Sequence, residues 1–264
     1  KNRANANKQL VRFLLEQCEK TDLRLCDIQA GGLHNAIPRE AHATVAVPTA
    51  YAATFVTELE AFVAKVREEF SATEPDLTAA LEAADAASTC ICPEQAVRML
   101  KSLNVVHNGI FAMSQDLEGL VETSSNLASV RKHGNQVVAT TSQRSSVASN
   151  LEYMASVVRS AFELGGAKCV TNEGYPGWKM NPKSEILKVC VESYKRLFGK
   201  EPLVRAIHAG LECGLFSEKY PNLDMVSFGP TLRGVHSPDE RLLIPTVQMV
   251  WDHLLDVLKN IPAK

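Results

Sequence analysis

Several features that would direct a protein to membranes or nucleic acids are missing from this 264-residue chain. No apolar run approaches the roughly 18 residues that a membrane-spanning helix needs. The opening residues, KNRANANKQL, lack the apolar segment of a secretory signal peptide. Lys and Arg do not gather into a basic block, and the net charge is only -2. We therefore expect a cytoplasmic protein that acts on a small molecule, with neither nucleic acid nor membrane as a partner.

Paired CxxC units are also absent, which argues against a structural zinc site built from cysteines. The chain has seven cysteines, an odd number, scattered through segments of helical or extended pattern. We interpret them as buried thiols. They are Cys18, Cys26, Cys90, Cys92, Cys169, Cys190 and Cys213.

A methionine is missing from the start, and the chain opens directly into an amphipathic segment. We interpret this as the absence of the N-terminal part of a longer protein. The composition, 45% hydrophobic and 22% charged, is that of a folded protein with one large or two ordinary globular domains.

The order of the predicted elements repeats within the first 172 residues. The first copy has helices at 5–19 and 51–70, strands at 23–29 and 41–47, and a closing strand within 71–85. The second copy has helices at 93–103 and 149–164, strands at 119–123, 136–142 and 167–172, and a turn over 124–135. Helix-strand-strand-helix-strand, found twice, is most of a split βαβ, ferredoxin-like unit. We therefore predict a doubled domain over residues 1–165, with the first strand of its first copy missing.

The pattern changes after residue 174. Helices at 184–198, 211–219 and 245–258 alternate with strands at 204–207 and 225–227, which is typical of an α/β domain. Two strands cannot bury both faces of a sheet. We therefore interpret residues 166–264 as the C-terminal half of a larger α/β domain into which the doubled unit is inserted.

Two polar, glycine-rich loops follow the predicted strands of this second part. They are HAGLECG, with His208, Gly210 and Glu212, and GPTLRGVHSPDE, with His236. Because ligands gather beyond the carboxyl ends of strands in open α/β sheets, these side chains are expected to meet at one edge. Imidazole and carboxylate groups are zinc ligands, so a metal site is the favoured interpretation over solvated loop residues.

The motifs VETSSNLASV, GYPGW, HAGLECGLF, MVSFGPTLRGVHSPDE and IPAK, with RANANKQLVRFL and NAIPREAHATVAV, run the length of the chain. Together they resemble the aminoacylhistidine dipeptidases, also named Xaa-His or cytosolic non-specific dipeptidases, which are carnosinase-like dizinc peptidases. The resemblance implies an α/β catalytic domain that holds two zinc ions and is interrupted by an α+β lid of two ferredoxin-like βαββαβ repeats. It also implies hydrolysis of dipeptides, including carnosine-type Xaa-His substrates, by a zinc-activated water.

The resemblance assigns His236 as a zinc ligand and places most other ligands and the general base upstream of this chain. Since zinc needs three or four protein ligands, the chain alone is expected to hold no tight catalytic metal, to contain no catalytic residue and to be inactive. His208, Gly210 and Glu212 match the substrate-binding loop of the family.

In the same clan, an asparagine near the lid turn and an arginine at the end of the next strand bind the free carboxylate of the substrate. The second copy offers Asn126 and Arg144 at these positions, whereas the first has Asn35 but no arginine. The planar guanidinium pairs with a carboxylate through two hydrogen bonds, which suits a site that must measure substrate length. The alternative is that Arg144 is a surface arginine that caps or forms an ion pair. We interpret Arg131, Lys132 and His133 as a solvated charged tip.

Two further functions stay open. The chain could be a non-catalytic module that binds small molecules or dimerises, or the enzyme could hydrolyse N-acyl amino acids. A homodimer and a monomer are both compatible with the sequence, because a doubled lid can mimic a partner subunit.

Overall fold

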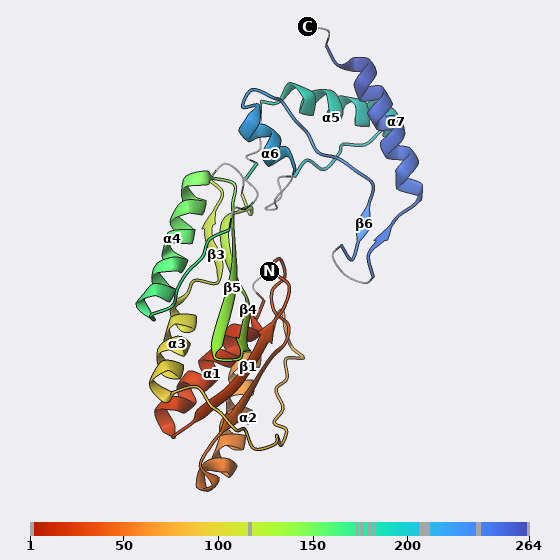
Figure 1. The fold of residues 1–264 in the computed structure, drawn as a ribbon. Helices are drawn as coiled ribbons and strands as arrows, with labels where there is room; N and C mark the ends of the chain where they lie inside the picture. Colours follow the sequence, from red (N-terminus) through yellow and green to blue (C-terminus); the bar gives the residue numbers. More distant parts are fainter. Residues whose placement is uncertain are drawn as a thin grey trace. The chain divides into compact units, whose positions relative to one another are not determined.

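The computed structural model describes residues 3–115, 118–172, 174, 177–178, 181, 183–205, 212–235 and 239–262 (Figure 1). The chain divides into two compact units, residues 1–173 and 174–264. This division lies close to the domain boundary at 165/166, which itself stays a prediction. None of the helices in the described ranges is long and apolar enough to cross a membrane.

The first unit contains helices packed around strands, but the predicted repeat of helix-strand-strand-helix-strand is matched only in part. Its elements are α1 (Ala6–Lys20), β1 (Arg24–Gly31), β2 (Ala41–Ala46), the 3-10 turn η1 (Thr49–Tyr51), α2 (Ala52–Glu69), α3 (Pro93–Val105), β3 (Gly109–Met113), β4 (Val121–His133), β5 (Gln136–Ser145) and α4 (Ala148–Leu164). The closing strands predicted within 71–85 and at 167–172 are wrong, because both segments are irregular. Strand β3 was not predicted.

The predicted turn over 124–135 is also wrong, because β4 continues through it to His133. Its serines and asparagine suggested a turn. In the structure, however, Thr123, Ser125 and Leu127 are buried on one face of the strand. Burial of a long face therefore overrides the local turn preference. The true hairpin turn comes at Gly134, which has a positive φ of 57°.

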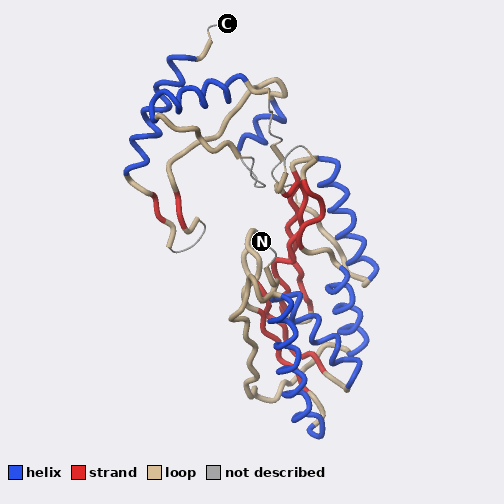
Figure 2. The backbone as a smooth tube through the Cα atoms, turned by 180° about the vertical axis from the view of Figure 1, so that it is seen from behind, coloured by secondary structure: helices blue, strands red, loops and turns tan. Residues whose placement is uncertain are grey.

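The two copies form one continuous antiparallel sheet (Figure 2). The strand order is β2-β1-β4-β3, and β5 pairs with the other edge of β4. One edge of β4 is covered by β3 over Val121 to Ser125 and by β1 over Ser129 to Arg131. Strand β4 therefore pairs with both other strands of the second copy, β3 and β5, and also joins this copy to β1 of the first.

A shared apolar core holds the helices to this sheet. Helix α1 contacts α2, α3 and β4, and α4 contacts α3, β4 and β5. Phe13 of α1 lies between Phe55 and Phe62 of α2, with ring centroids 5.3 Å apart in both pairs. The mixed helix and sheet class predicted from the sequence is confirmed.

The strand junction between the copies requires a glycine. Gly31 has a φ of 72°, and a side-chain carbon there would overlap the carbonyl oxygen of Ala128 and lie 2.7 Å from Nδ2 of Asn7. The backbone N–H of Gly32 donates to the same Ala128 carbonyl (3.2 Å), and that of Gly31 donates to Glu40 (3.0 Å). The backbones of β1 and β4 thus approach too closely for a side chain.

The second unit consists of α5 (Glu185–Phe198), α6 (Glu212–Lys219), α7 (Pro245–Asn260) and a hairpin of β6 (Leu232–Arg233) and β7 (Arg241–Leu242). The three predicted helices are confirmed. The strand predicted at 225–227 is wrong, and residues 204–205 of the other are irregular, while 206–207 lie outside the described residues.

Helices α5 and α7 pack around His253. Its Nε2 lies 2.9 Å from the carbonyl oxygen of Cys190, and its ring contacts Tyr194 and Phe228. Arg196 of α5 pairs with Asp256 of α7 (2.5 Å). Helices α5 and α7 are therefore held together by an ion pair and a hydrogen bond as well as by ring contacts.

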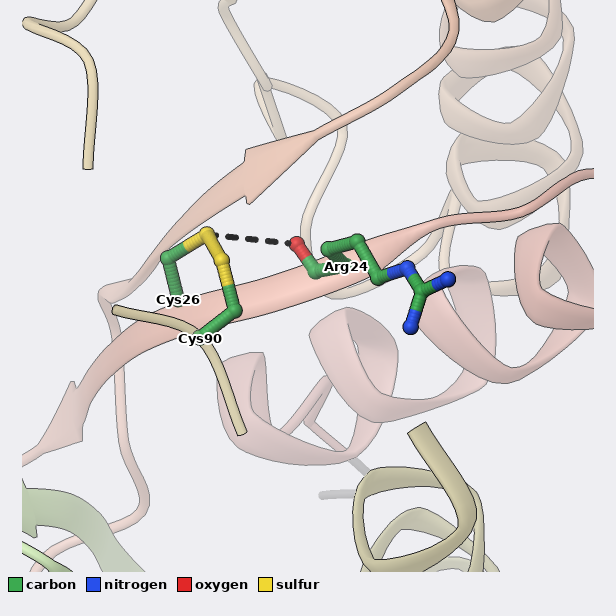
Figure 3. Close-up of a disulfide and its surroundings, with 3 residues drawn as sticks. All are labelled: Arg24, Cys26 and Cys90. Carbon is green, nitrogen blue, oxygen red and sulfur yellow. Dashed lines mark hydrogen bonds between the residues drawn. A yellow bond between two sulfur atoms is a disulfide. The ribbon is translucent and has the colours of Figure 1, made fainter. Parts of the chain in front are cut away.

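The interpretation of all cysteines as buried thiols is wrong. Cys26 and Cys90 form a disulfide, and Cys26 Sγ lies 3.5 Å from the carbonyl oxygen of Arg24 (Figure 3). The segment before α3 returns to β1, where the N–H of Ile91 donates to Leu25 (2.8 Å). This return brings together two cysteines that are 64 positions apart. Among the rest, Cys190 is buried and Cys92 is exposed, and the others are half-buried.

We expect Gly31→Ala to lower the free energy of unfolding by more than about 3 kcal/mol, because the new methyl group must push β1 away from β4. Gly134→Ala is the matched control, since Gly134 also has a positive φ but has nothing within 4 Å of the added carbon. That variant should lose only about 1 kcal/mol. Urea unfolding followed by circular dichroism measures both, and equal losses would contradict the close approach.

Candidate functional site

The predicted carboxylate-binding residues lie next to each other on the sheet. Asn126 of β4 pairs with Ser142 of β5, and Ser124 pairs with Arg144. Asn126 and Arg144 are therefore diagonal neighbours on one face of the ladder, where Cα atoms lie about 7–8 Å apart. Because Thr123 and Ser125 point into the core, Asn126 and Arg144 share the opposite, partly exposed face. The structure thus brings this predicted pair together.

The ion-pair alternative for Arg144 finds no support in the described part of the chain. Arg144 is half-buried, and none of the acidic side chains described there forms an ion pair with it. Its guanidinium therefore keeps its capacity for an anionic partner.

Asn126 also contacts the turn of the first copy. Its Nδ2 donates to the carbonyl oxygen of Ala36 (2.7 Å), and its Oδ1 accepts from Nδ2 of Asn5 (3.3 Å). His34 and Asn35 lie exposed in the same turn. The second copy's asparagine is therefore held by residues of the first.

Three asparagines fill the gap between β3 and β1 along the edge of β4. Leu127 lies in this gap, where its backbone has no strand partner on that side. Its N–H donates to Oδ1 of Asn108 (2.9 Å), and its carbonyl oxygen accepts from Nδ2 of Asn5 (3.1 Å) and of Asn7 (3.0 Å). Buried backbone groups need such partners, so the amides replace the missing ladder bonds.

None of these three asparagines was predicted as a functional residue from the sequence. The signal for Asn5 was present, since Asn is favoured at the position before a helix. Asn7 and Asn108 gave no such signal, because a buried amide in a helix or a loop has no characteristic spacing.

Lys8 ties α1 to the end of α3. Its Nζ donates to the carbonyl oxygens of Leu103 (2.8 Å), Asn104 (2.7 Å) and Val106 (3.0 Å). These acceptors belong to the last turn of α3, where helix carbonyls lack internal partners. Burial nevertheless lowers the pKa of Lys8 to about 8.

The hairpin tip formed by Arg131, Lys132 and His133 was predicted to be solvated. In the structure it also makes a contact within the protein. Arg131 donates to the carbonyl oxygen of Gly31 (2.8 Å), so it also braces the junction between the copies. A shallow hollow of about 450 Å³ lies beside it. The hollow is lined by Gly32, Leu33, Ser129, Arg131, His133, Val138 and Thr140.

The predicted residues of the second unit are not tested. His208, Gly210 and His236 lie outside the described residues, and Glu212 begins α6 without a described side chain. Within the ranges that the structure describes, no three His, Cys, Asp or Glu side chains gather as a metal site.

Residues 1–74 match the family described as the peptidase dimerisation domain. The whole chain is 40% identical over 260 residues to the cytosol non-specific dipeptidase of Escherichia coli (strain K12), covering 98% of this chain and 54% of that protein. The crystal structure of aminoacylhistidine dipeptidase from Vibrio alginolyticus is 38% identical, with a TM-score of 0.87, covering 100% of this chain and 54% of that one.

These matches confirm the resemblance found in the motifs. The chain is similar to the cytosol non-specific dipeptidase over 98% of its length and to the aminoacylhistidine dipeptidase over 100% of it. It spans about half the length of the relatives that it matches.

The stability difference between the wild type and Lys8→Met should depend on pH. The pKa of Lys8 is lowered from 10.5 to about 8, so between these values the unfolded chain holds more protons than the folded one. The contribution of Lys8 to stability therefore rises as the pH increases from 8 to 10.5. Over that window, the free energy of unfolding of the wild type should increase relative to that of Lys8→Met.

Lys20→Met is the control on the same helix. The hydrogen bond that Lys20 donates to the Glu58 carboxylate raises the pKa of Lys20 above 10.5, so the contribution of Lys20 to stability should stay constant through this window and fall only at higher pH. Urea midpoints at several pH values measure both differences. A difference in urea midpoint between the wild type and Lys8→Met that does not change with pH would contradict the lowered pKa of Lys8.

Proposed function

We propose that the full-length protein hydrolyses dipeptides and that Asn126 and Arg144 hold the free C-terminal carboxylate of the substrate. The observation that carries this proposal is their diagonal placement on the partly exposed face of the β4–β5 ladder. The two dipeptidase relatives support the reaction class.

The chemistry of the two side chains suits a carboxylate. A guanidinium offers two parallel N–H groups that match both carboxylate oxygens. Asn126 uses one N–H of its amide for Ala36 and keeps a second one as a donor. A site that requires this carboxylate one residue beyond the cleaved bond accepts dipeptides and rejects peptides that extend further on the C-terminal side of that bond.

Zinc belongs to this proposal through the resemblance alone, with His236 as one ligand and the other ligands and the general base in the part of the full-length protein outside this chain. When bound, zinc supplies a water of lowered pKa and polarises the amide carbonyl. His208, Gly210 and Glu212 are proposed to line the substrate site. We further propose a preference that includes Xaa-His dipeptides and a cytoplasmic location. The peptidase dimerisation match at residues 1–74 supports a homodimer.

In the full-length protein, Arg144→Ala should lower kcat/KM for dipeptides by roughly 30- to 900-fold, the equivalent of about 2 to 4 kcal/mol, because a charge-assisted bidentate contact is lost. The wild type should discriminate strongly against the same dipeptide with a C-terminal amide, and the variant should lose that discrimination. Zinc content should not change.

Arg159→Ala provides the control, because Arg159 is an exposed arginine of α4 that donates to Thr171 (2.6 Å). Its kinetics should match the wild type. Absence of dipeptide hydrolysis by the full-length wild type would defeat the proposal, and hydrolysis of N-acetyl amino acids in its place would favour an N-acyl amino acid hydrolase.

His236→Ala should lower the zinc stoichiometry of the full-length protein and abolish turnover, with only partial recovery in excess zinc, because a ligand is lost. The 264-residue chain on its own should bind no zinc tightly and hydrolyse no dipeptide. Metal analysis of purified protein checks both. Full zinc occupancy and normal turnover in His236→Ala would show that His236 is a solvated loop residue and not a zinc ligand.

A further inference from the structure

We infer that Asn5 is a positioning residue that fixes which atoms of the Asn126 amide face the substrate. This inference rests on the proposed carboxylate-binding role of Asn126. Asn5 ends the loop before α1 and is 2% exposed, so it does not touch substrate itself. It acts through its hydrogen bond to Asn126.

The orientation of the Asn5 amide is set by helix α1. Oδ1 of Asn5 accepts from the backbone N–H of Lys8 (3.2 Å), which is the capping bond at the start of the helix. A flipped amide would turn NH2 toward this N–H and lose the cap. The NH2 group of Asn5 must therefore point toward β4.

The NH2 group of Asn5 has three acceptors within reach. They are Oδ1 of Asn108 (2.9 Å), the carbonyl oxygen of Leu127 (3.1 Å) and Oδ1 of Asn126 (3.3 Å). Since two hydrogens serve three acceptors, one hydrogen is shared. Asn108 is itself fixed, because its Oδ1 also accepts from the N–H of Leu127 (2.9 Å).

These contacts leave the Asn126 amide one favourable orientation. Its Oδ1 faces the NH2 group of Asn5, and its Nδ2 faces the carbonyl oxygen of Ala36 at 2.7 Å. A flip would bring NH2 against NH2 on one side and oxygen against oxygen on the other. The start of α1 and the Ala36 carbonyl together determine, across the junction of the two copies, that Asn126 offers an N–H and not an oxygen to an anion.

Asn5→Ser tests this, because serine keeps the capping oxygen but has no amide donor for Asn126. In the full-length protein we expect KM for dipeptides to rise by about three- to tenfold, the scale of one lost hydrogen bond, with kcat little changed. Hydrolysis of the dipeptide amide should change much less.

Asn7→Ala is the matched control. Asn7 is fully buried and donates to the same Leu127 carbonyl (3.0 Å) but not to Asn126. It should reduce stability without raising KM, which separates positioning from general loss of packing. Asn5→Thr, which also keeps a capping oxygen and lacks the amide donor without adding a charge, guards against a folding defect peculiar to serine.

A double-mutant cycle decides whether Asn5 acts through Asn126. Asn126→Ala should raise KM, and Asn5→Ser should raise it no further in that background. If Asn126→Ala raises KM but Asn5→Ser behaves like Asn7→Ala, the positioning role is overturned and the proposed function stands. If Asn126→Ala leaves KM unchanged, the role of Asn126 in the proposed function fails, and the inference fails with it.

Discussion

The pairing of β1 with β4 is the contact on which the first unit depends. Three residue pairs, centred on Ala30 and Val130, join the two copies of the repeat into one sheet. Because the strands meet where Gly31 lies against the Ala128 carbonyl, no side chain fits at this crossing. A short ladder with so few bonds needs support, and it receives it from Arg131, which donates to Gly31 across the junction.

The same junction leaves a gap on the edge of β4, and the polar residues that fill it organise the candidate site. Leu127 has neither β3 nor β1 beside it, so its backbone groups bond to side-chain amides. The amide of Asn5 has a partner for its oxygen and acceptors for its NH2 group, which restricts this amide to a single orientation. One member of the group reaches Asn126, so a device that completes a sheet edge also orients a residue on the partly exposed face. The hydrogen bonds among these asparagines therefore complete the edge of β4 and also support the proposed recognition of the substrate.

Much of the fold could be predicted from local pattern. The long helices have apolar residues at helical spacing, and Phe13 and Leu14 of the predicted face of α1 are buried in the core. The motif that contains Asn126 and the strand end at Arg144 identified a pair that the ladder places together. Pattern failed where a distant partner decided the outcome. Strand β4 continues through a serine-rich stretch because the face with Thr123, Ser125 and Leu127 is buried in the core. The segments 71–85 and 167–172 are irregular, although their pattern suggested strands. The loop residues His208 and His236 stay predictions from the sequence.

The sequence by itself determined the helices and the relationship to the dipeptidases and singled out Asn126 and Arg144, because each depends on residues close together in the chain or on motifs read directly. Only the tertiary structure decided that the two copies share a sheet, that Cys26 meets Cys90, and that Asn5, Asn7 and Asn108 converge on Leu127. The physical reason is that these contacts join positions far apart in the sequence. Their free energy comes from burial and from satisfied hydrogen bonds, which no local spacing records.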